Sequence, residues 1–158
     1  MATAYLGLGS NLGNKRGYLI TAMSLLAERA GDIPVVSGFH ETVPWGFTSP
    51  NTFLNVAVRL NTALSPTDLL AVMQQIEREL GRTHKTDGAT WQDRTIDIDI
   101  LMYDNMLMDT KELTLPHPFM HRRLFVMQPL VEIAPRLCHP VLKCSMTELL
   151  GILISRKS

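Results

Sequence analysis

The sequence predicts one α+β domain in which four strands and two helices follow one another as strand, helix, strand, strand, helix and strand. Segments with apolar residues at every second position indicate the strands, and segments with apolar residues at helical spacing lie between them. At 158 residues and 46% hydrophobic content, the chain is long enough to bury one substantial core. We expect residues 1–158 to form a single domain, because no repeat, linker or low-complexity run divides them.

The first half of the chain supplies three strands and one helix. Residues 3–9 (TAYLGLG) predict a strand that ends at glycines. Residues 18–29 carry apolar side chains at helical spacing, which predicts an amphipathic helix closed by Gly31. Residues 33–43 predict the second strand, and the alternating residues 53–62 predict the third.

The second helix has a clear start signal. Ser65 can act as the N-cap, Pro66 fits the first helical position, and Asp68 supplies an acid at the third. We expect this helix to stop at Gly81 and the fourth strand to follow over residues 93–103. The resulting order is the ferredoxin-like β-α-β-β-α-β arrangement, which implies an antiparallel sheet.

Further elements follow this core. Asp104 and Asn105 predict a hairpin turn into an added strand at residues 106–109. Proline-rich turns and C-terminal helices come next, one of them near residues 145–154.

The fourth strand carries two aspartates on one face. Isoleucine recurs at positions 96, 98 and 100, so Asp97 and Asp99 point to the opposite face, only about 7 Å apart. Two carboxylates this close repel each other and raise each other's pKa unless a cation lies between them. Oxygen ligands without Cys or His suit Mg²⁺, which also binds substrate phosphates. We favour a magnesium–nucleotide site over the alternative, a solvent-exposed polar face.

Two polar loops are candidates for phosphate binding. Residues 7–15 (GLGSNLGNK) follow a strand and precede a helix, but their spacing fits no phosphate-loop motif, so a turn and helix start is the better interpretation. Residues 81–94 place Arg82, His84, Lys85 and Arg94 directly before the paired aspartates. A solvated charged connection is the alternative, but cations beside a carboxylate pair are what a polyphosphate–metal site needs.

Composition argues against several other classes. Fifteen basic and fifteen acidic residues cancel, which disfavours non-specific binding to nucleic acid or a membrane surface. No apolar run reaches the ~20 residues of a membrane span, and no signal peptide is evident. Cys138 and Cys144 are too few for a disulfide framework, and His139 has no second ligand pair for zinc. We therefore expect a cytoplasmic protein.

Four blocks of the sequence resemble the 6-hydroxymethyl-7,8-dihydropterin pyrophosphokinases of folate biosynthesis. They are GSNLG near the start, ETVPWG…FLN (41–55), GR…W..RTIDIDIL (81–101) and LTLPHPFMHRRLFVMQPL (113–130). The resemblance implies a ferredoxin-like core, two Mg²⁺ ions, and transfer of a diphosphate from ATP to the pterin's hydroxymethyl oxygen with release of AMP.

The same resemblance implies roles for individual residues. Asp97 and Asp99 match the magnesium ligands, and Arg82 and Arg94 match arginines that engage the triphosphate. Other positions that match ATP contacts are Gln74, Glu77, Trp91, Ile100, Thr114, His117 and Arg123. Positions that match pterin contacts are Thr42, Trp45, Phe53, Asn55 and Phe125. Without the resemblance, Phe53 and Phe125 would be ordinary core residues.

The chain departs from the family pattern near the nucleotide. Gln92 and Asp93 replace a usual Gly-Pro, Glu112 stands at an often basic position, and His84 replaces a frequent arginine. The resemblance further implies that loops at 44–51 and 82–93 close over the substrates. We expect a monomer, and the sequence leaves open whether it works fused to a neighbouring pathway enzyme.

Two functions of other classes compete with this one. A metal-dependent phosphodiesterase or nuclease could also use the aspartate pair, but it would need more acidic ligands and usually a basic surface. An RNA-binding module can share the strand order, but RNA readers place several aromatics on central strands. Here the fourth strand offers only Tyr103, at its end.

Overall fold

The computed structural model describes residues 1–42, 52–81 and 95–157. Its elements in chain order are β1 (Ala2–Ser10), α1 (Lys15–Arg29), β2 (Gly31–Val36), β3 (His40–Thr42), β4 (Phe53–Thr62), α2 (Pro66–Glu79), β5 (Asp97–Tyr103), β6 (Met108–Asp109), β7 (Thr114–Leu115), a 3₁₀ turn (Met120–Arg122), α3 (Leu124–Ile133) and α4 (Met146–Lys157).

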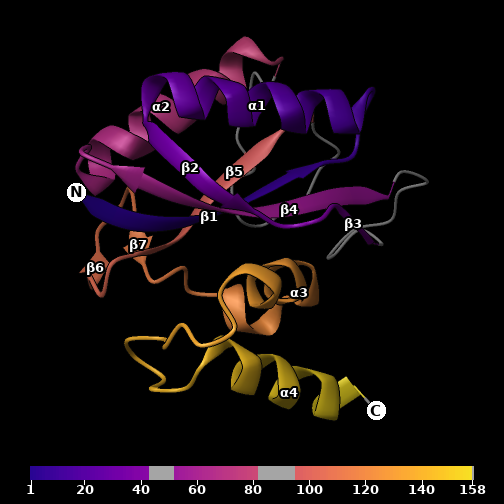
Figure 1. Ribbon diagram of the computed structural model, residues 1–158, viewed down its shortest axis with the longest axis vertical. Helices are drawn as coiled ribbons and strands as arrows, with labels where there is room; N and C mark the ends of the chain where they lie inside the picture. The colour runs from indigo at the N-terminus through magenta and orange to yellow at the C-terminus, as the bar shows by residue number, and fades with distance from the viewer. Residues whose placement is uncertain (43–51, 82–94, 158) are drawn as a thin grey trace.

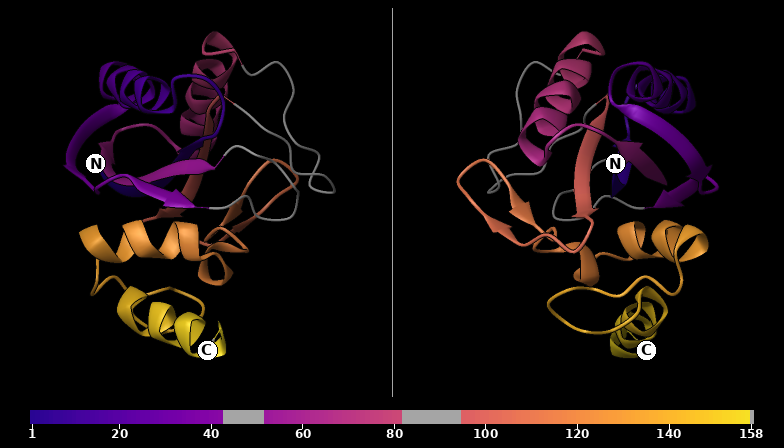
Figure 2. Two further views of the ribbon diagram at one scale, coloured as in Figure 1. Left: turned by 90° about the vertical axis from the view of Figure 1, so that its right-hand side faces the viewer. Right: turned by 60° about the vertical axis from the view of Figure 1, so that its left-hand side comes forward.

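The main sheet is antiparallel and has the strand order β2-β4-β1-β5, with β3 also paired to β4. Helices α1 and α2 cover one face of the sheet (Figure 1). Helix α3 lies against the opposite face, and α4 lies beyond α3 (Figures 1 and 2). The predicted α+β class and ferredoxin-like order are confirmed.

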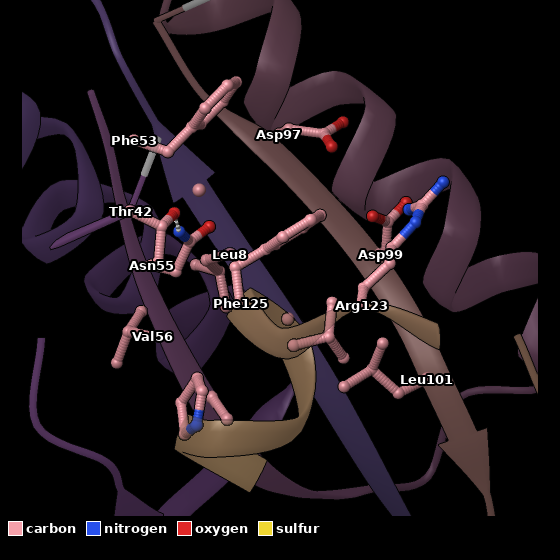
Figure 3. A pocket seen from close by; sticks show the side chains of 15 residues that line it. Leu8, Thr42, Phe53, Asn55, Val56, Asp97, Asp99, Leu101, Arg123 and Phe125 are labelled. Atoms are coloured by element: carbon pink, nitrogen blue, oxygen red, sulfur yellow. Dashed lines mark hydrogen bonds between the residues drawn. The ribbon is translucent and has the colours of Figure 1, made fainter. Parts of the chain in front are cut away.

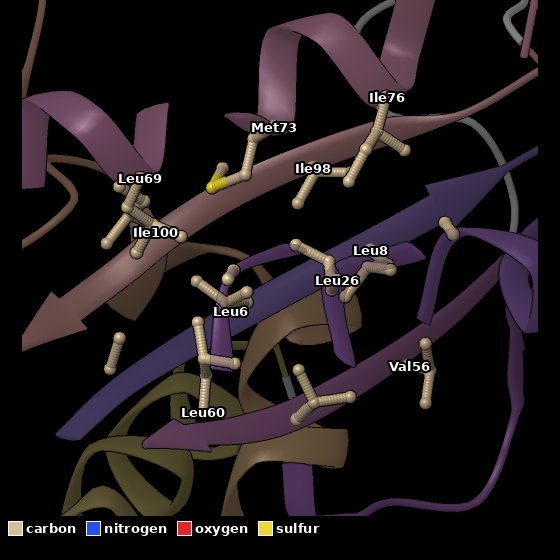
Figure 4. Close-up of a cluster of buried hydrophobic side chains, with 14 of the residues drawn as sticks. Leu6, Leu8, Leu26, Val56, Leu60, Leu69, Met73, Ile76, Ile98 and Ile100 are labelled. Carbon is tan, nitrogen blue, oxygen red and sulfur yellow. The ribbon is translucent and has the colours of Figure 1, made fainter. Parts of the chain in front are cut away.

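Two hydrophobic clusters hold these layers together. The larger one packs side chains of β1, β4 and β5, such as Leu6, Val58 and Ile98, against α1 and α2 (Figure 4). The second packs Leu101 of β5 against Met127 of α3, and it continues to α4. The sheet is therefore buried on both faces, and any cleft on the α3 side must open between the sheet and α3.

The helix boundaries follow local capping. The Ser65 hydroxyl accepts the N–H of Asp68 at 3.2 Å, as predicted, and α2 ends at Glu79, two residues before the predicted stop at Gly81. Helix α1 begins at Lys15, earlier than predicted, because the Asn14 side chain caps it by accepting the N–H of Gly17 at 3.1 Å.

Two details of the predicted topology are wrong. The predicted strand 33–43 is divided into β2 and β3, because Ser37 turns its backbone and hydroxyl onto Ala57 of β4. The turn after Tyr103 is present, but the strand that follows it, β6, pairs with β7 rather than with β5. Helix α3 is a C-terminal helix for which no bounds were predicted, and Pro129 lies inside it.

The C-terminal helix expected near residues 145–154 is confirmed as α4. Among the described helices, none is long and apolar enough to cross a membrane.

Candidate active site

A cleft opens between the sheet and α3, on the face that α1 and α2 leave uncovered. Strands β1, β3, β4 and β5 form its floor and sides, and α3 with the residue before it forms its roof (Figure 3). Its lining residues are Gly7, Leu8, Gly9, Thr42, Phe53, Asn55, Val56, Ala57, Asp97, Asp99, Leu101, Arg123, Phe125, Val126 and Pro129.

Two glycines of β1 keep the floor of the cleft open. Gly9 pairs with Asn55 on one side and with Asp97 on the other, so these three positions form one row across the sheet. Gly7 forms the next row, with Asp99 on one side. A Cβ atom at Gly9 would lie only 2.8 Å from the Oδ1 atom of Asn55. The missing side chain therefore leaves room for the Asn55 amide and for a ligand beside it.

One end of the cleft carries an amide between two aromatic rings. Asn55 is 6% exposed, and its Nδ2 atom donates to the Thr42 hydroxyl at 2.9 Å. Phe53 comes from β4 and Phe125 from α3, and both rings are half-buried in the cleft (Figure 3). The predicted pterin residues Thr42, Phe53, Asn55 and Phe125 are thus brought together.

The other end of the cleft carries the paired carboxylates. Asp97 and Asp99 are half-buried and lie along β5 on the cleft side, whereas the neighbouring isoleucines are buried under α2 (Figures 3 and 4). The predicted division of this strand into a carboxylate face and an apolar face is confirmed. The alternative of a plain exposed polar face is wrong, because these side chains line a cleft.

Arg123 places a cation beside the carboxylates. Arg123 is 6% exposed, and Figure 3 shows the guanidinium directed toward Asp99. The guanidinium carbon lies 5.5 Å from the ring centre of Phe119 and 5.8 Å from that of Phe125. Aromatic faces attract cations at such distances, so the rings help to hold this charge at the cleft.

The donor chemistry of this end fits a hard divalent cation. The two carboxylates offer oxygen ligands, which Mg²⁺ prefers, and Mg²⁺ commonly takes its other ligands from water and substrate phosphates. Within the described parts of the chain, no group of three or more His, Cys, Asp or Glu side chains is arranged to hold a metal. The described residues therefore do not provide a full set of protein ligands for a metal. A metal held by Asp97 and Asp99 would take further ligands from a bound phosphate.

The residues predicted on α2 lie behind β5. Gln74 is half-buried, and Glu77 is 4% exposed. A carboxylate oxygen of Glu77 accepts the backbone N–H of Ile98 at 2.8 Å. Ile100 is 3% exposed and its side chain belongs to the hydrophobic core. None of these three side chains lines the cleft, so any contact of Ile100 with a ligand must use its backbone.

Thr114 and His117 line a second cleft, of about 470 Å³, between the β6–β7 hairpin and the segment after α3. The backbone N–H of His117 donates to the carbonyl of Leu101 at 2.9 Å. The second cleft therefore adjoins the end of β5.

The remaining predicted residues lie outside the described part of the chain. They are Trp45, Arg82, Trp91 and Arg94, together with the departures His84, Gln92 and Asp93.

Several lining residues were missed by sequence reasoning. Gly7 and Gly9 were placed in the first strand, as the structure has them, but they were not predicted to line a site. Glycines inside an otherwise apolar strand can mark a close approach of another group, and that signal was available. Val126 and Pro129 of α3 gave no such signal.

Comparison with known proteins identifies relatives of the whole domain. The family model described as 7,8-dihydro-6-hydroxymethylpterin-pyrophosphokinase matches residues 5–135. A 2-amino-4-hydroxy-6-hydroxymethyldihydropteridine pyrophosphokinase of Porphyromonas gingivalis is 50% identical over 141 residues, which cover 89% of this chain and 95% of that protein. The enzyme of the same name from Aquifex aeolicus is 40% identical over 148 residues, covering 94% of this chain and 90% of that protein.

A solved structure agrees on the fold. The crystal structure of wild-type HPPK-DHPS of Plasmodium falciparum superposes with a TM-score of 0.77 at 16% identity, covering 98% of this chain. The match covers only 45% of that chain, so this chain spans less than half of the two-part protein.

Proposed function

The chain belongs to the 7,8-dihydro-6-hydroxymethylpterin pyrophosphokinase family, and we propose that its reaction takes place in the cleft between the sheet and α3. Members of this family are ATP-dependent transferases of folate biosynthesis, and this enzyme moves a diphosphate from ATP to 6-hydroxymethyl-7,8-dihydropterin. The family assignment decides against the nuclease and RNA-binding alternatives.

The observation that supports this placement is the row Asn55, Gly9 and Asp97 across the sheet. On one side of Gly9 lies the Asn55 amide, which suits the polar edge of a pterin. On the other side lies the Asp97 carboxylate, which suits a metal ion with a bound phosphate. A substrate lying across Gly9 would therefore present its ring to Asn55 and its hydroxymethyl oxygen toward Asp97 and Asp99.

The pterin would bind at the aromatic end. A pterin is flat and rich in donors and acceptors, so it suits two ring faces and one amide. Phe53 and Phe125 would cover the ring, and Asn55 would pair with its polar edge. The hydrogen bond from Asn55 to Thr42 holds the amide in one orientation before the substrate arrives.

The diphosphate would be transferred at the carboxylate end. Bound Mg²⁺, two ions by family resemblance, would neutralise phosphate charge there. Asp97 and Asp99 would hold the metal, and Arg123 would stabilise negative charge on the phosphates. The ionisable side chains that line the described cleft are these three alone. Catalysis would then rest on positioning and charge stabilisation more than on a general base.

The rest of the nucleotide would lie beyond β5. Besides Arg123, the described positions that match ATP contacts of the family are Gln74, Glu77, Ile100, Thr114 and His117. Arg82, Trp91 and Arg94 would complete the triphosphate site, and Trp45 the pterin site. A monomeric state and a cytoplasmic location stay predictions.

Two asparagines of β4 provide a test of the pterin placement. Asn55→Ala should weaken pterin binding by about 1–3 kcal/mol, because a polar ring edge would lose its partner. Asn61→Ala is the matched control, since Asn61 lies on the same strand opposite Thr3, outside the cleft. Isothermal titration measures the pterin affinity of each variant in the presence of a non-hydrolysable MgATP analogue, and a titration with the analogue alone measures the nucleotide affinity. Equal loss of pterin and nucleotide affinity in Asn55→Ala would place this residue in the scaffold instead.

A further inference from the structure

The pterin end of the cleft is built from two elements that are far apart in sequence. Thr42 of β3 holds the Asn55 amide, and α3 supplies Phe125 on the other side. A ring can be held between them only if α3 and β3 keep a fixed separation. What joins these two elements therefore affects how well the pocket is formed before a substrate binds.

Glu132, near the end of α3, makes that connection. One carboxylate oxygen accepts the backbone N–H of Gly38 at 2.6 Å, and the other lies 2.8 Å from Nε2 of His40. His40 is the first residue of β3 and pairs with Asn55 across to β4. The contact thus links the third turn of α3 to the strand that carries Thr42.

The chemistry of the contact favours a defined geometry. The hydrogen bond from the Gly38 N–H lowers the pKa of the Glu132 carboxyl below its usual value, and the hydrogen bond with His40 makes the next largest contribution. Glu132 is therefore ionised at neutral pH, and hydrogen bonds to an ionised acceptor are shorter and stronger than neutral ones. Two donors on two oxygens also fix the direction of the carboxylate, which a single contact would not.

The contact is too exposed to contribute much to global stability. The side chains are 46% exposed for Glu132 and 28% exposed for His40, and exposed ion pairs stabilise proteins little. The two hydrophobic clusters hold the fold together without it. The expected effect of Glu132 is on the position of α3 relative to β3.

We propose that Glu132 is a positioning residue for the pterin pocket, which sets the separation of Phe125 from Asn55 and Thr42 by tying α3 to Gly38 and His40. Glu132 itself does not line the cleft. The inference rests on the proposed placement of the pterin at this end of the cleft.

Steady-state kinetics of the full chain test this role. In Glu132→Ala, the Michaelis constant for the pterin should rise about three- to tenfold, the loss of one or two modest hydrogen bonds. The Michaelis constant for MgATP should change less than about twofold, because that end of the cleft is held by β5. Glu132→Gln keeps an acceptor for one of the two donors and should recover part of the pterin affinity.

Glu148→Ala is the matched control. Glu148 is also a carboxylate that accepts a backbone N–H, from Ser145 at 2.9 Å, but it lies on α4 outside the cleft. It should leave both Michaelis constants unchanged.

Three results would overturn the proposal. They are an unchanged pterin constant in Glu132→Ala, a parallel rise for both substrates, and an equal rise in Glu148→Ala. Asn55→Ala, measured alongside, distinguishes the two levels of inference. If it weakens pterin binding while Glu132→Ala does not, only the positioning role fails. If Asn55→Ala has no effect either, the placement of the pterin is wrong.

Discussion

The carboxylate of Glu77 in α2 accepts the backbone N–H of Ile98 at 2.8 Å, and Ile98 is the residue between Asp97 and Asp99. Strand β5 lies at the edge of the described sheet, so groups on its outer side have no neighbouring strand to bond. Glu77 satisfies one of them and anchors the strand at the point where both aspartates emerge.

Replacing Glu77 should therefore destabilise the fold in a way that depends on the acceptor. Glu77→Met removes the acceptor and leaves the Ile98 N–H buried without it, at an expected loss of about 1–3 kcal/mol in the free energy of unfolding. Glu77→Gln retains an acceptor oxygen and should lose less. Urea unfolding curves of both variants measure the difference, and equal losses would show that this hydrogen bond contributes little.

The open floor at Gly9 should be more sensitive to a methyl group than the floor at Gly7. A Cβ at Gly9 would lie 2.8 Å from the Asn55 Oδ1 atom, whereas a Cβ at Gly7 would meet Leu101 at an ordinary 3.5 Å. Gly9→Ala must displace the Asn55 amide, so pterin affinity should fall by at least about tenfold, equivalent to 1.4 kcal/mol. Gly7→Ala, compared by the same titration, should lose less. A similar loss in both would mean that displacement of the Asn55 amide is not what weakens pterin binding.

The parts of the fold that local patterns determine were predicted well. Strand β4 lies at residues 53–62 as its alternation indicated, and α2 begins after Ser65 as its cap indicated. The errors concern long-range choices. Alternating apolar residues do not predict that Ser37 will form a hydrogen bond with Ala57 and divide a strand. They also do not predict that β6 will pair with β7. The position of α3 was not predicted, because Pro129 lies inside it and proline inside a helix is disfavoured.

The site shows the same division. The two faces of β5 follow from alternation alone, so the carboxylate pair was visible in the sequence. Phe53 and Phe125 look like core residues in isolation, and only the family resemblance marked them for the pterin. Glu132 and Gly38 carry no local signal, because their contact depends on how α3 docks on β3.

Two histidines near the second cleft should make stability depend on pH. His139 is 4% exposed, and burial lowers its pKa below the ordinary value of about 6.5, with a smaller contribution from His121. Burial likewise lowers the pKa of His121, helped by Arg122 and Arg156. For a lowered pKa, the stabilisation is present above pH ~6.5 and is lost as pH falls through the folded-state value.

The free energy of unfolding should therefore decrease as the pH falls from 7 toward 5. Nδ1 of His139 accepts the N–H groups of Val141 and Leu142, at 3.2 and 3.1 Å. His139→Asn can keep such an acceptor while removing the titration, and it should flatten this pH dependence. Urea unfolding at several pH values measures it, and an unchanged slope in His139→Asn would assign the effect to other groups.

The stability of the metal-free protein tests whether the paired aspartates of β5 serve as metal ligands or as structural residues. If Asp97 and Asp99 hold the metal, their proximity is unfavourable without it, by roughly 0.5–2.5 kcal/mol for unit charges about 7 Å apart. Asp97→Asn keeps the shape and removes one charge. In chelator, its free energy of unfolding should stay within about 1 kcal/mol of the wild-type value or rise. A larger loss would show that this aspartate anchors the fold.

The decisive measurement is the rate at which Asp97→Asn and Asp99→Asn release AMP at saturating Mg²⁺, ATP and pterin. The wild-type enzyme should form AMP in equal amount to the pterin diphosphate. Both variants should be slower by about 10²-fold or more, the usual effect of losing one element of transition-state charge stabilisation. Near-normal AMP release by either variant would contradict the assignment of that aspartate as a working metal ligand, and with it the site proposed for diphosphate transfer.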